Sequence, residues 1–444
     1  MEKTIAALAT PPGVSGLAVI RISGDEARNI IEKIFFRKNN NYMESHKIYV
    51  GKIYDDLEFI DQVTVAYFEK PHSYTGEDVI EISCHGGIFV VDRILKLIYS
   101  LGAVYPKPGE FTLRAFKNGK MDLTQVEAVG NLINAESPAG SKTAARQLEG
   151  SFRKKLKYYK NILLNTASKL ELGFDFNEED IEIITKNEIL QGCKEVLGFC
   201  ESLAGDYKAS EILRSGYFIA LTGKPNAGKS ELFNALLNRR RAIVSSIEGT
   251  TRDYLEEKLI LNDITVRLFD TAGIRETSDE IEIEGLKMSR SIIEQSDMII
   301  LINDITKGLD NSESILKTLN QNYPEKEFLL LHNKADLIES TKDEYSVSAK
   351  TGDGVEELKA KIYQTAKLST ERISDILINQ RHAELLNKSA EYINNAIQGV
   401  EDEVDETIIA FELRKAIGKL EEITGERYNE EILNTIFDGF CIGK

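Results

Sequence analysis

A glycine-rich segment near the middle of the chain has the residue types and spacing that hold a phosphate chain. Residues 223–230 read Gly-Lys-Pro-Asn-Ala-Gly-Lys-Ser, after the apolar run 217–221 and before a helical stretch at 231–237. In this pattern backbone amides and the helix N-terminus face anionic oxygens, the lysine neutralises β- and γ-phosphate oxygens, and the serine ligates magnesium. The segment predicts a nucleoside triphosphate site in which Lys229 and Ser230 take these two roles.

A second motif, about one hundred residues later, indicates which base is bound. Residues 333–336 read Asn-Lys-Ala-Asp and follow the apolar run 328–331. The aspartate carboxylate accepts from the N1 and N2 donors of guanine, which adenine does not offer. Residues 348–350 fit a loop whose backbone amides meet guanine O6. The sequence therefore favours GTP over ATP, with these predicted guanine-binding residues: Asn333, Lys334, Asp336, Ser348, Ala349 and Lys350.

Two segments between these motifs carry residues that would respond to the γ-phosphate. The strand-like run 266–269 ends in Asp-Thr-Ala-Gly, where Asp270 would hold magnesium through water and the Gly273 amide would sense the γ-phosphate. Thr250 and Thr251 are candidates for the threonine that closes on magnesium. The further predicted nucleotide contacts are Asn226, Ala227, Gly228, Glu231, Ser245, Ser246, Ile247, Glu248, Gly249, Thr271 and Ala272.

One position departs from the commonest pattern of small GTPases. Ile274 stands where a glutamine usually orients the attacking water, and an aliphatic side chain cannot do this. Carboxylates follow closely, at Glu276, Asp279, Glu280, Glu282 and Glu284. Most carboxylates in such a loop are solvated surface, so the residues alone do not identify the one that would position water.

The elements around the motifs indicate a multidomain chain. Residues 18–22, 63–68 and 79–83 predict strands, and 25–36 and 86–101 predict helices, so residues 1–118 form an α+β domain. Apolar residues recur at helical spacing through 123–213 and again after 370. We expect an all-α helical domain, in parts 119–215 and 369–444, with an α/β P-loop (Ras-like) G domain inserted at 216–368.

Composition limits the classes of protein that remain. The 444 residues have a net charge of −17, which argues against coating nucleic acid or membrane through bulk charge. Residues 1–118 and 119–215 carry only −1 and −2, so a nucleic-acid substrate is compatible with the total. The chain has no apolar run of about 18 residues and no signal-peptide pattern, so we expect a cytoplasmic protein without a membrane span. The cysteines fit free thiols: Cys84, Cys193, Cys200 and Cys441.

One dense basic run lies within the first helical stretch. It consists of Arg153, Lys154, Lys155, Lys157 and Lys160. Such runs are usually solvated helix faces, and a patch that contacts tRNA phosphates is the alternative. The sequence leaves this choice open.

Short motifs along the whole chain carry a resemblance to a known family. They are Ala-Thr-Pro-Pro-Gly at 9–13, Leu-Ala-Val-Ile-Arg-Ile-Ser-Gly at 17–24, Ser-Tyr-Thr-Gly-Glu-Asp at 73–78, His-Gly-Gly at 85–87, Pro-Gly-Glu-Phe-Thr at 108–112 and Phe-Cys-Ile-Gly-Lys at 440–444. Together with the inserted G domain, they make the chain similar to the MnmE/TrmE family, GTPases that modify the wobble uridine of tRNA.

The resemblance implies that the N-terminal domain binds folate and forms a dimer. The family's folate positions correspond to Arg21, Glu81, Lys120 and Lys444. A carboxylate suits the N–H groups of a pterin, and basic groups suit the glutamate tail. The cofactor implied is a folate of the 5-formyltetrahydrofolate or methylenetetrahydrofolate type. Cys441, beside Lys444, has either a chemical role or a packing role.

The resemblance also implies a potassium ion beside the nucleotide. The family's potassium positions correspond to Asn226, Ser245, Ile247 and Thr250, and its magnesium positions to Ser230 and Thr251. Serine replaces the family's threonine at 245, which keeps an oxygen ligand but predicts weaker potassium affinity. Glu282 matches the glutamate that orients the catalytic water, with Glu284 as the alternative register.

The reaction implied is shared with a partner. In the family, GTP hydrolysis accompanies pairing of two G domains, and the FAD-dependent protein MnmG completes a heterotetramer-type complex. The product carries a carboxymethylaminomethyl or aminomethyl group at uridine C5. Two alternatives remain at this point: a regulatory GTPase without a chemical task, and a folate-dependent aminomethyltransferase with a regulatory G domain.

Overall fold

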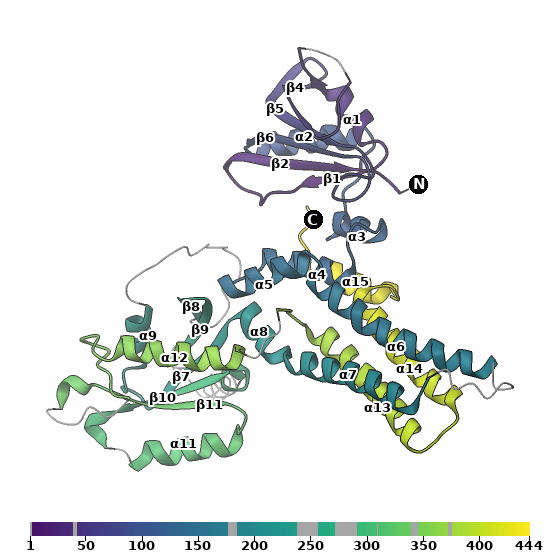
Figure 1. Ribbon diagram of the computed structural model, residues 1–444. Helices are drawn as coiled ribbons and strands as arrows, with labels where there is room; N and C mark the ends of the chain where they lie inside the picture. Colours follow the sequence, from purple (N-terminus) through teal and green to yellow (C-terminus); the bar gives the residue numbers. More distant parts are fainter. Residues whose placement is uncertain are drawn as a thin grey trace, which may run out of the picture. The chain divides into compact units, whose positions relative to one another are not determined.

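A computed structural model describes residues 2–38, 42–175, 184–237, 256–270, 291–308, 310–338, 345–371 and 375–444. The chain divides into two compact units (Figure 1). Unit 1 contains residues 1–130, 148–192 and 395–444, and unit 2 contains residues 131–147 and 193–394. The predicted domain boundaries differ from these limits, because helices of the predicted helical domain contribute to both units. Those boundaries stay a prediction.

Unit 1 begins with an antiparallel sheet. Its strands are β1 (Ile5–Leu8), β2 (Ser15–Ser23), β3 (Phe35–Phe36), β4 (Lys47–Asp55), β5 (Glu58–Phe68) and β6 (Val79–Gly86), in the spatial order β1-β2-β6-β5-β4-β3. Alternate residues of β2 and β6, such as Ile20, Ile22 and Ile82, are buried against α1 (Ala27–Ile34) and α2 (Ile88–Ser100). The intervening residues, which include Arg21 and Glu81, face the other side of the sheet.

One predicted helix boundary was wrong. We expected a helix through Phe36, but α1 ends at Ile34, and Phe35 is already extended. Phe35 pairs with Ile53 of β4 as a short edge strand. Aromatic residues suit strands well, so the tertiary pairing outweighs the helical periodicity here.

The remaining helices of unit 1 bring the two helical stretches together. Among them, α6 (Ser151–Asp175) from the first stretch packs along α14 (Glu406–Thr424) from the second, and Arg414 reaches Glu171 at 2.6 Å. A small apolar cluster joins α4 (Leu123–Ile133) to α15 (Glu430–Asp438) through Val126 and Phe437. The other helices with residues in this unit are α3 (Glu110–Lys117), α7 (Lys186–Gly205) and α13 (Gln380–Glu401).

Unit 2 contains a mainly parallel sheet. Its strands are β7 (Tyr217–Gly223), β8 (Glu256–Leu261), β9 (Ile264–Asp270), β10 (Met298–Asp304) and β11 (Glu327–Asn333), in the order β11-β10-β7-β9-β8, with only β8 antiparallel to its neighbour. Its helices include α5 (Pro138–Leu148), α8 (Tyr207–Ser215), α9 (Lys229–Leu237), α11 (Asp310–Asn322) and α12 (Val355–Thr370). The carboxyl ends of four parallel strands meet at one edge of this sheet, where ligands bind in open α/β folds.

Candidate functional site

The phosphate loop lies between β7 and α9, as the sequence predicts. Asn226 and Gly228 both have positive φ angles, 63° and 91°, so the chain turns sharply before the helix begins. Nζ of Lys229 donates to the carbonyl oxygens of Gly223 at 2.8 Å and Lys224 at 3.0 Å. Burial lowers the pKa of Lys229, and the nearby Asp270 carboxylate opposes this shift. The loop therefore holds an ammonium group inside its own curve, where a phosphate oxygen would replace the two carbonyls.

Two predicted magnesium-binding residues meet beside the loop. The Ser230 hydroxyl donates to Oδ2 of Asp270 at 3.0 Å, joining the start of α9 to the end of β9. Asp270 is buried, at 5% exposure. Hydroxyl and carboxylate oxygens are ligands that Mg²⁺ accepts, and magnesium at phosphates keeps several waters. The pair thus fits a magnesium ion held directly by Ser230 and through water by Asp270.

The Asn-Lys-Ala-Asp segment is bonded to the phosphate loop. The Asn333 side chain donates to the carbonyl oxygen of Ala227 at 2.9 Å and accepts from the amide of Ala349 at 3.0 Å. Asn333 thus connects the phosphate loop to the 348–350 loop, although more than one hundred residues separate it from the former.

Lys334 makes a second link to the phosphate loop. Its Nζ donates to the carbonyl oxygen of Asn226 at 2.8 Å and to Oδ2 of Asp304 at 2.7 Å. The hydrogen bond from Lys334, followed by one from Thr306, lowers the pKa of Asp304 to about 2. Asp304 ends β10, so three neighbouring strands contribute to this contact.

Asp336 lies in the short 3₁₀ turn η3 (Ala335–Leu337) directly after Asn333 and Lys334. Its Oδ1 accepts from the Ser348 hydroxyl at 2.7 Å. The backbone of 332–335 also pairs with 345–347, through Val347 to His332 at 2.7 Å and Ala335 to Val347 at 3.1 Å. These bonds fix the orientation of the carboxylate and bring Asp336, Ser348 and Ala349 into one loop cluster, while Lys350 follows them in the chain.

Several predicted residues lie outside the described part of the chain. These are Ser245, Ser246, Ile247, Glu248, Gly249, Thr250, Thr251, Thr271, Ala272, Gly273, Glu282 and Glu284. Their predicted roles in binding potassium and magnesium, sensing the γ-phosphate and orienting water stay predictions.

A second cluster of charged side chains forms on the sheet of unit 1. Arg21 of β2 and Glu81 of β6 are directly paired across the strands, and the closest Arg21–Glu81 nitrogen–oxygen distance is 2.8 Å. The arginine side chain is 13% exposed and the glutamate 29%, so the ion pair is half-buried rather than fully solvated. The Arg21 guanidinium also lies 5.1 Å from the ring centre of Tyr74 and 5.8 Å from that of Phe111.

The C-terminal tail reaches this cluster. The carbonyl oxygen of Gly443 lies 3.5 Å from an Arg21 nitrogen, and Nζ of Lys444 is 5.9 Å from the Tyr74 ring centre. Burial, and then the charge of Arg21, lower the pKa of Lys444, while Glu81 opposes the shift. Two cations, a carboxylate and aromatic rings thus surround one half-buried place, which fits a flat heterocycle with a charged tail.

The other two residues predicted near this cluster behave differently. Lys120 donates to the carbonyl oxygen of Pro71 at 2.9 Å, so its contact lies away from the Arg21–Glu81 pair. Cys441 is exposed, and its carbonyl oxygen accepts from the amide of Lys444 at 3.1 Å. The structure therefore brings together Arg21, Glu81 and Lys444, with Cys441 in the same tail.

Sequence reasoning missed Asp304, Tyr74 and Phe111. A signal for Asp304 was present, since it ends an apolar run, Met-Ile-Ile-Leu-Ile-Asn-Asp at 298–304, that resembles the other parallel strands. The rings of Tyr74 and Phe111 gave no such signal. Aromatic residues in loops and helices more often pack in cores, and only the fold shows that these two face Arg21.

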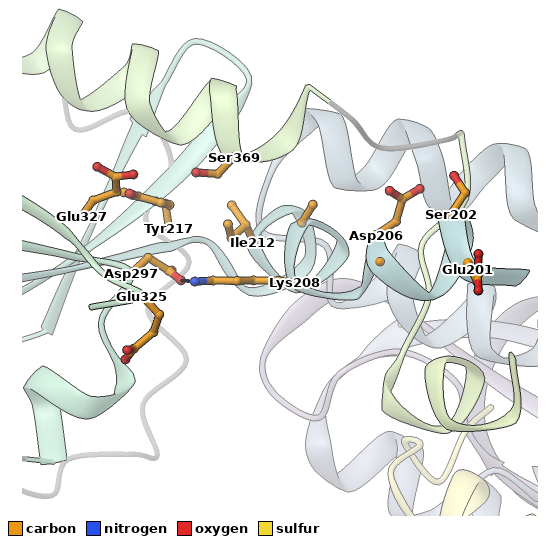
Figure 2. A pocket seen from close by; sticks show the side chains of 12 residues that line it. Glu201, Ser202, Asp206, Lys208, Ile212, Tyr217, Asp297, Glu325, Glu327 and Ser369 are labelled. Atoms are coloured by element: carbon orange, nitrogen blue, oxygen red, sulfur yellow. Dashed lines mark ion pairs between the residues drawn. The ribbon is translucent and has the colours of Figure 1, made fainter. Parts of the chain in front are cut away.

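A separate cavity of about 500 Å³ lies at the amino ends of the parallel strands, within unit 2 (Figure 2). Its lining includes Asp297, Glu325 and Glu327 from the sheet edge and Lys208 from α8. Lys208 lies 3.9 Å from Asp297, whose pKa is raised by burial. None of the predicted nucleotide residues lines this cavity, which is at the opposite end of the strands from the phosphate loop.

Two further findings concern the described residues only. None of their helices is long and apolar enough to cross a membrane. They also contain no group of three or more His, Cys, Asp and Glu side chains placed to hold a metal ion. A magnesium site at Ser230 and Asp270 would thus depend on water and phosphate oxygens for its other ligands.

Comparisons with known proteins agree with these sites. The family model described as the MnmE helical domain matches residues 123–441, and the one described as the GTP-binding protein TrmE N-terminus matches residues 4–120. A crystal structure of Aquifex aeolicus Era bound to GDP·AlF4⁻ shares 26% identity over 33% of this chain and 56% of that chain, but its TM-score of 0.27 is too low to support an argument.

Curated relatives match nearly the whole chain. The tRNA modification GTPase MnmE of Cytophaga hutchinsonii is 37% identical over 99% of this chain and 98% of its own length. The protein of the same name from Syntrophus aciditrophicus is 39% identical over 100% of both chains. These matches confirm the expected family and, with the two observed sheets and the helices, the expected fold class. The chain belongs to the MnmE/TrmE family of tRNA modification GTPases.

Proposed function

We propose that this protein hydrolyses GTP to drive modification of the wobble uridine of certain tRNAs, with a folate as one-carbon donor. The observation that carries the nucleotide part is the bonding of residues 333–336 to the phosphate loop, through Asn333 to Ala227 and Lys334 to Asn226. Base recognition and phosphate binding thus belong to one rigid constellation. The names of the relatives support the tRNA part.

In the proposed GTP site each residue acts on a defined part of the nucleotide. Asp336 accepts from guanine N1 and N2, and the backbone at Ser348–Lys350 meets O6. Lys229 leaves the carbonyls of Gly223 and Lys224 and neutralises β- and γ-phosphate oxygens. Magnesium, held by Ser230 and Thr251 and through water by Asp270, would withdraw charge from the same oxygens. The proposed remaining contacts are those of the segments 226–231, 245–251 and 271–273.

We propose that a potassium ion and a glutamate replace the usual catalytic groups. Asn226, Ser245, Ile247 and Thr250 would hold potassium, which supplies positive charge where an arginine finger acts in other GTPases. Asn226 has the left-handed backbone that lets the loop close around an ion. Glu282 would orient the attacking water, because Ile274 cannot. Pairing of two G domains would complete the site.

In the proposed carrier site Glu81 accepts from the N–H groups of the pterin. Arg21 and Lys444 neutralise the carboxylates of the folate tail, and Tyr74 and Phe111 offer ring faces. The folate supplies the one-carbon unit. Lys120 belongs to this site only if it leaves Pro71, and Cys441 is the neighbouring group with nucleophilic chemistry.

The proposed partners follow from the family. Two copies of the chain form a dimer through their N-terminal parts, and the FAD-dependent MnmG completes the complex that acts on tRNA in the cytoplasm. The modification added at uridine C5 is carboxymethylaminomethyl or aminomethyl. The folate and the flavin supply the bond-making chemistry, and GTP hydrolysis times it.

Nucleoside analysis of tRNA tests the overall proposal. A strain that lacks this chain should lose the C5 modification, and the wild-type gene should restore it. Arg21→Ala, which leaves the GTP site intact, should hydrolyse GTP at the wild-type rate but fail to restore the nucleoside. An unchanged nucleoside profile in the deletion strain would refute the proposed function.

The potassium role has its own test. GTP hydrolysis should be faster in KCl than in NaCl at the same ionic strength, and Asn226→Ala should remove that difference. The matched control is Asn262→Ala, at another positive-φ asparagine of unit 2, which should keep the potassium response. Equal wild-type rates in the two salts would exclude this role.

A further inference from the structure

The first twenty residues of α6 carry positive charge in an otherwise acidic chain. Residues 151–170 contain six basic side chains and no acidic one, whereas the whole chain has a net charge of −17. The structure divides these cations into two groups. Arg153 lies 3.4 Å from Asp122, and Lys160 pairs with Glu426 and lies 3.8 Å from Glu421. These two cations are already neutralised within the protein.

Lys154, Lys155 and Lys157 form the second group, which we call the α6 lysine patch. All three are exposed, and within the described residues none of them forms an ion pair. Phe152 and Leu156, on the opposite side of the same turns, are 0% and 1% exposed. Tyr158 continues the exposed face and is 57% exposed. The helix therefore buries its apolar side in the protein and presents three uncompensated cations and one aromatic ring.

The position of these cations costs the helix stability. The first turn of α6 contains no acidic residue and holds Arg153 and Lys154, followed at once by Lys155. The helix macrodipole places partial positive charge at this end, where anions stabilise and cations destabilise. Residues that violate a local rule without a compensating contact are expected at functional positions. An external anion would provide the missing compensation.

We propose that the α6 lysine patch binds the sugar–phosphate backbone of tRNA, with Tyr158 contacting a ribose or base. This inference rests on the proposed function, which makes tRNA the substrate. A membrane surface is a poorer match, because membrane-binding helices expose an apolar face and α6 buries its own. The patch also belongs to the same compact unit as Arg21, Glu81 and Lys444, where the one-carbon chemistry is proposed.

Such a surface would position tRNA without selecting its sequence. Lysine–phosphate contacts release counterions and carry no base information, which suits a protein that serves several tRNAs. The acidic remainder of the chain repels the same backbone, so binding would be confined to this surface. The low overall affinity expected from a charge of −17 thus becomes a means of orientation.

The test compares tRNA binding by the full-length wild type and the variant K154Q/K155Q/K157Q. Binding of an unmodified tRNA transcript is measured by fluorescence anisotropy at several salt concentrations. Each lysine–phosphate pair adds ~0.7 to the slope of log K against log salt, so replacing all three lysines should lower that slope by about two. The Kd at low salt should rise at least tenfold. Tyr158→Ala should weaken binding without changing the slope.

Two controls separate the patch from bulk charge and from misfolding. K107Q/K317Q/K388Q removes three exposed lysines elsewhere and should bind tRNA as the wild type does, within a few-fold. K154Q/K155Q/K157Q should keep the wild-type GTP hydrolysis rate and an equal or higher Tm, because glutamine is a comparable helix former and the helix end loses unfavourable charge. A purely structural role for the lysines would lower the Tm instead.

The outcomes distinguish this inference from the proposed function. A wild type that binds tRNA and a patch variant with the same Kd and slope would overturn the inference alone. Equal weakening by both triple variants would also overturn it, in favour of bulk charge. Loss of binding to anionic vesicles or to the flavoprotein partner, with tRNA binding intact, would assign the patch elsewhere. A wild type without any tRNA affinity would overturn both.

Discussion

At the guanine end of the proposed site, recognition depends on one carboxylate. Asp336 is oriented by the Ser348 hydroxyl at 2.7 Å, which occupies Oδ1 and leaves lone pairs for the base. Asp336→Asn replaces an acceptor by a donor against guanine N1 and N2. Two charge-assisted hydrogen bonds at ~1.5–3 kcal/mol each predict at least a hundredfold loss of GTP affinity, measured by titration calorimetry.

The matched control for this prediction is Asp353→Asn. Asp353 belongs to the same loop region, and its carboxylate accepts from the Thr351 hydroxyl at 2.8 Å on the exposed surface. This variant should bind GTP with near wild-type affinity. Wild-type GTP affinity in Asp336→Asn would show that the base is recognised elsewhere.

Lys444 gives a pH-dependent prediction. Burial and the charge of Arg21 lower its pKa below the ordinary 10.5, so the folded protein loses this positive charge at a lower pH than a free lysine does. Affinity for 5-formyltetrahydrofolate, whose tail is anionic, should therefore fall as pH rises from neutral towards 10.5. Arginine stays charged throughout, so Lys444→Arg should remove this decrease. The same decrease in both proteins would exclude Lys444 as its cause.

Among the elements, the approach of the β7–α9 loop to the end of β11 depends on Gly228. A Cβ at this position would lie 2.1 Å from Nδ2 of Asn333, and φ is +91°. Gly228→Ala should push the two loops apart, lower the free energy of unfolding by at least about 1–3 kcal/mol and abolish tight GTP binding. Urea unfolding and nucleotide titration measure the two effects.

Gly119→Ala separates backbone strain from this steric conflict. Gly119 has φ +69° and nothing within 4 Å of a built Cβ, so alanine there meets strain alone. We expect a modest loss of stability and unchanged GTP affinity. Should Gly228→Ala bind GTP equally well, the contact between loops would not be required for the site.

For the whole molecule, the exposed side of the N-terminal sheet is the proposed dimer surface. Ile48 and Val50 of β4 are 73% and 62% exposed, and Leu17 of β2 is 59% exposed. Apolar side chains gathered on one sheet face indicate an interaction surface. Ile48→Lys should convert a dimer into a species with a mass near 49.8 kDa by light scattering.

Leu57 provides the comparison for this variant. It lies in the turn between β4 and β5 and is 96% exposed, away from the regular face of the sheet. Leu57→Lys should leave the oligomeric state unchanged. A dimer that persists in Ile48→Lys would move the interface to another surface.

The sequence by itself determined the sites whose geometry is local. The phosphate loop needs closely spaced glycines and a following helix, and the turn at residues 333–336 follows directly from a buried strand, so both were predictable from adjacent residues. Family membership and fold class also followed from motifs in order along the chain. Local chemistry of this kind survives in sequence because neighbours in the chain are neighbours in space.

Only the tertiary structure decided which distant groups meet. Arg21 pairs with Glu81 because β2 and β6 are adjacent strands, and the carbonyl of Gly443 reaches Arg21 from 422 residues away. Asp304 joins Lys334 because β10 and β11 are parallel neighbours in register. The five cations at 153–160 of α6 look alike in sequence, yet packing against acidic partners neutralises Arg153 and Lys160 and leaves the α6 lysine patch without ion pairs among the described residues. Charge compensation acts through space, and a one-dimensional pattern does not contain those distances.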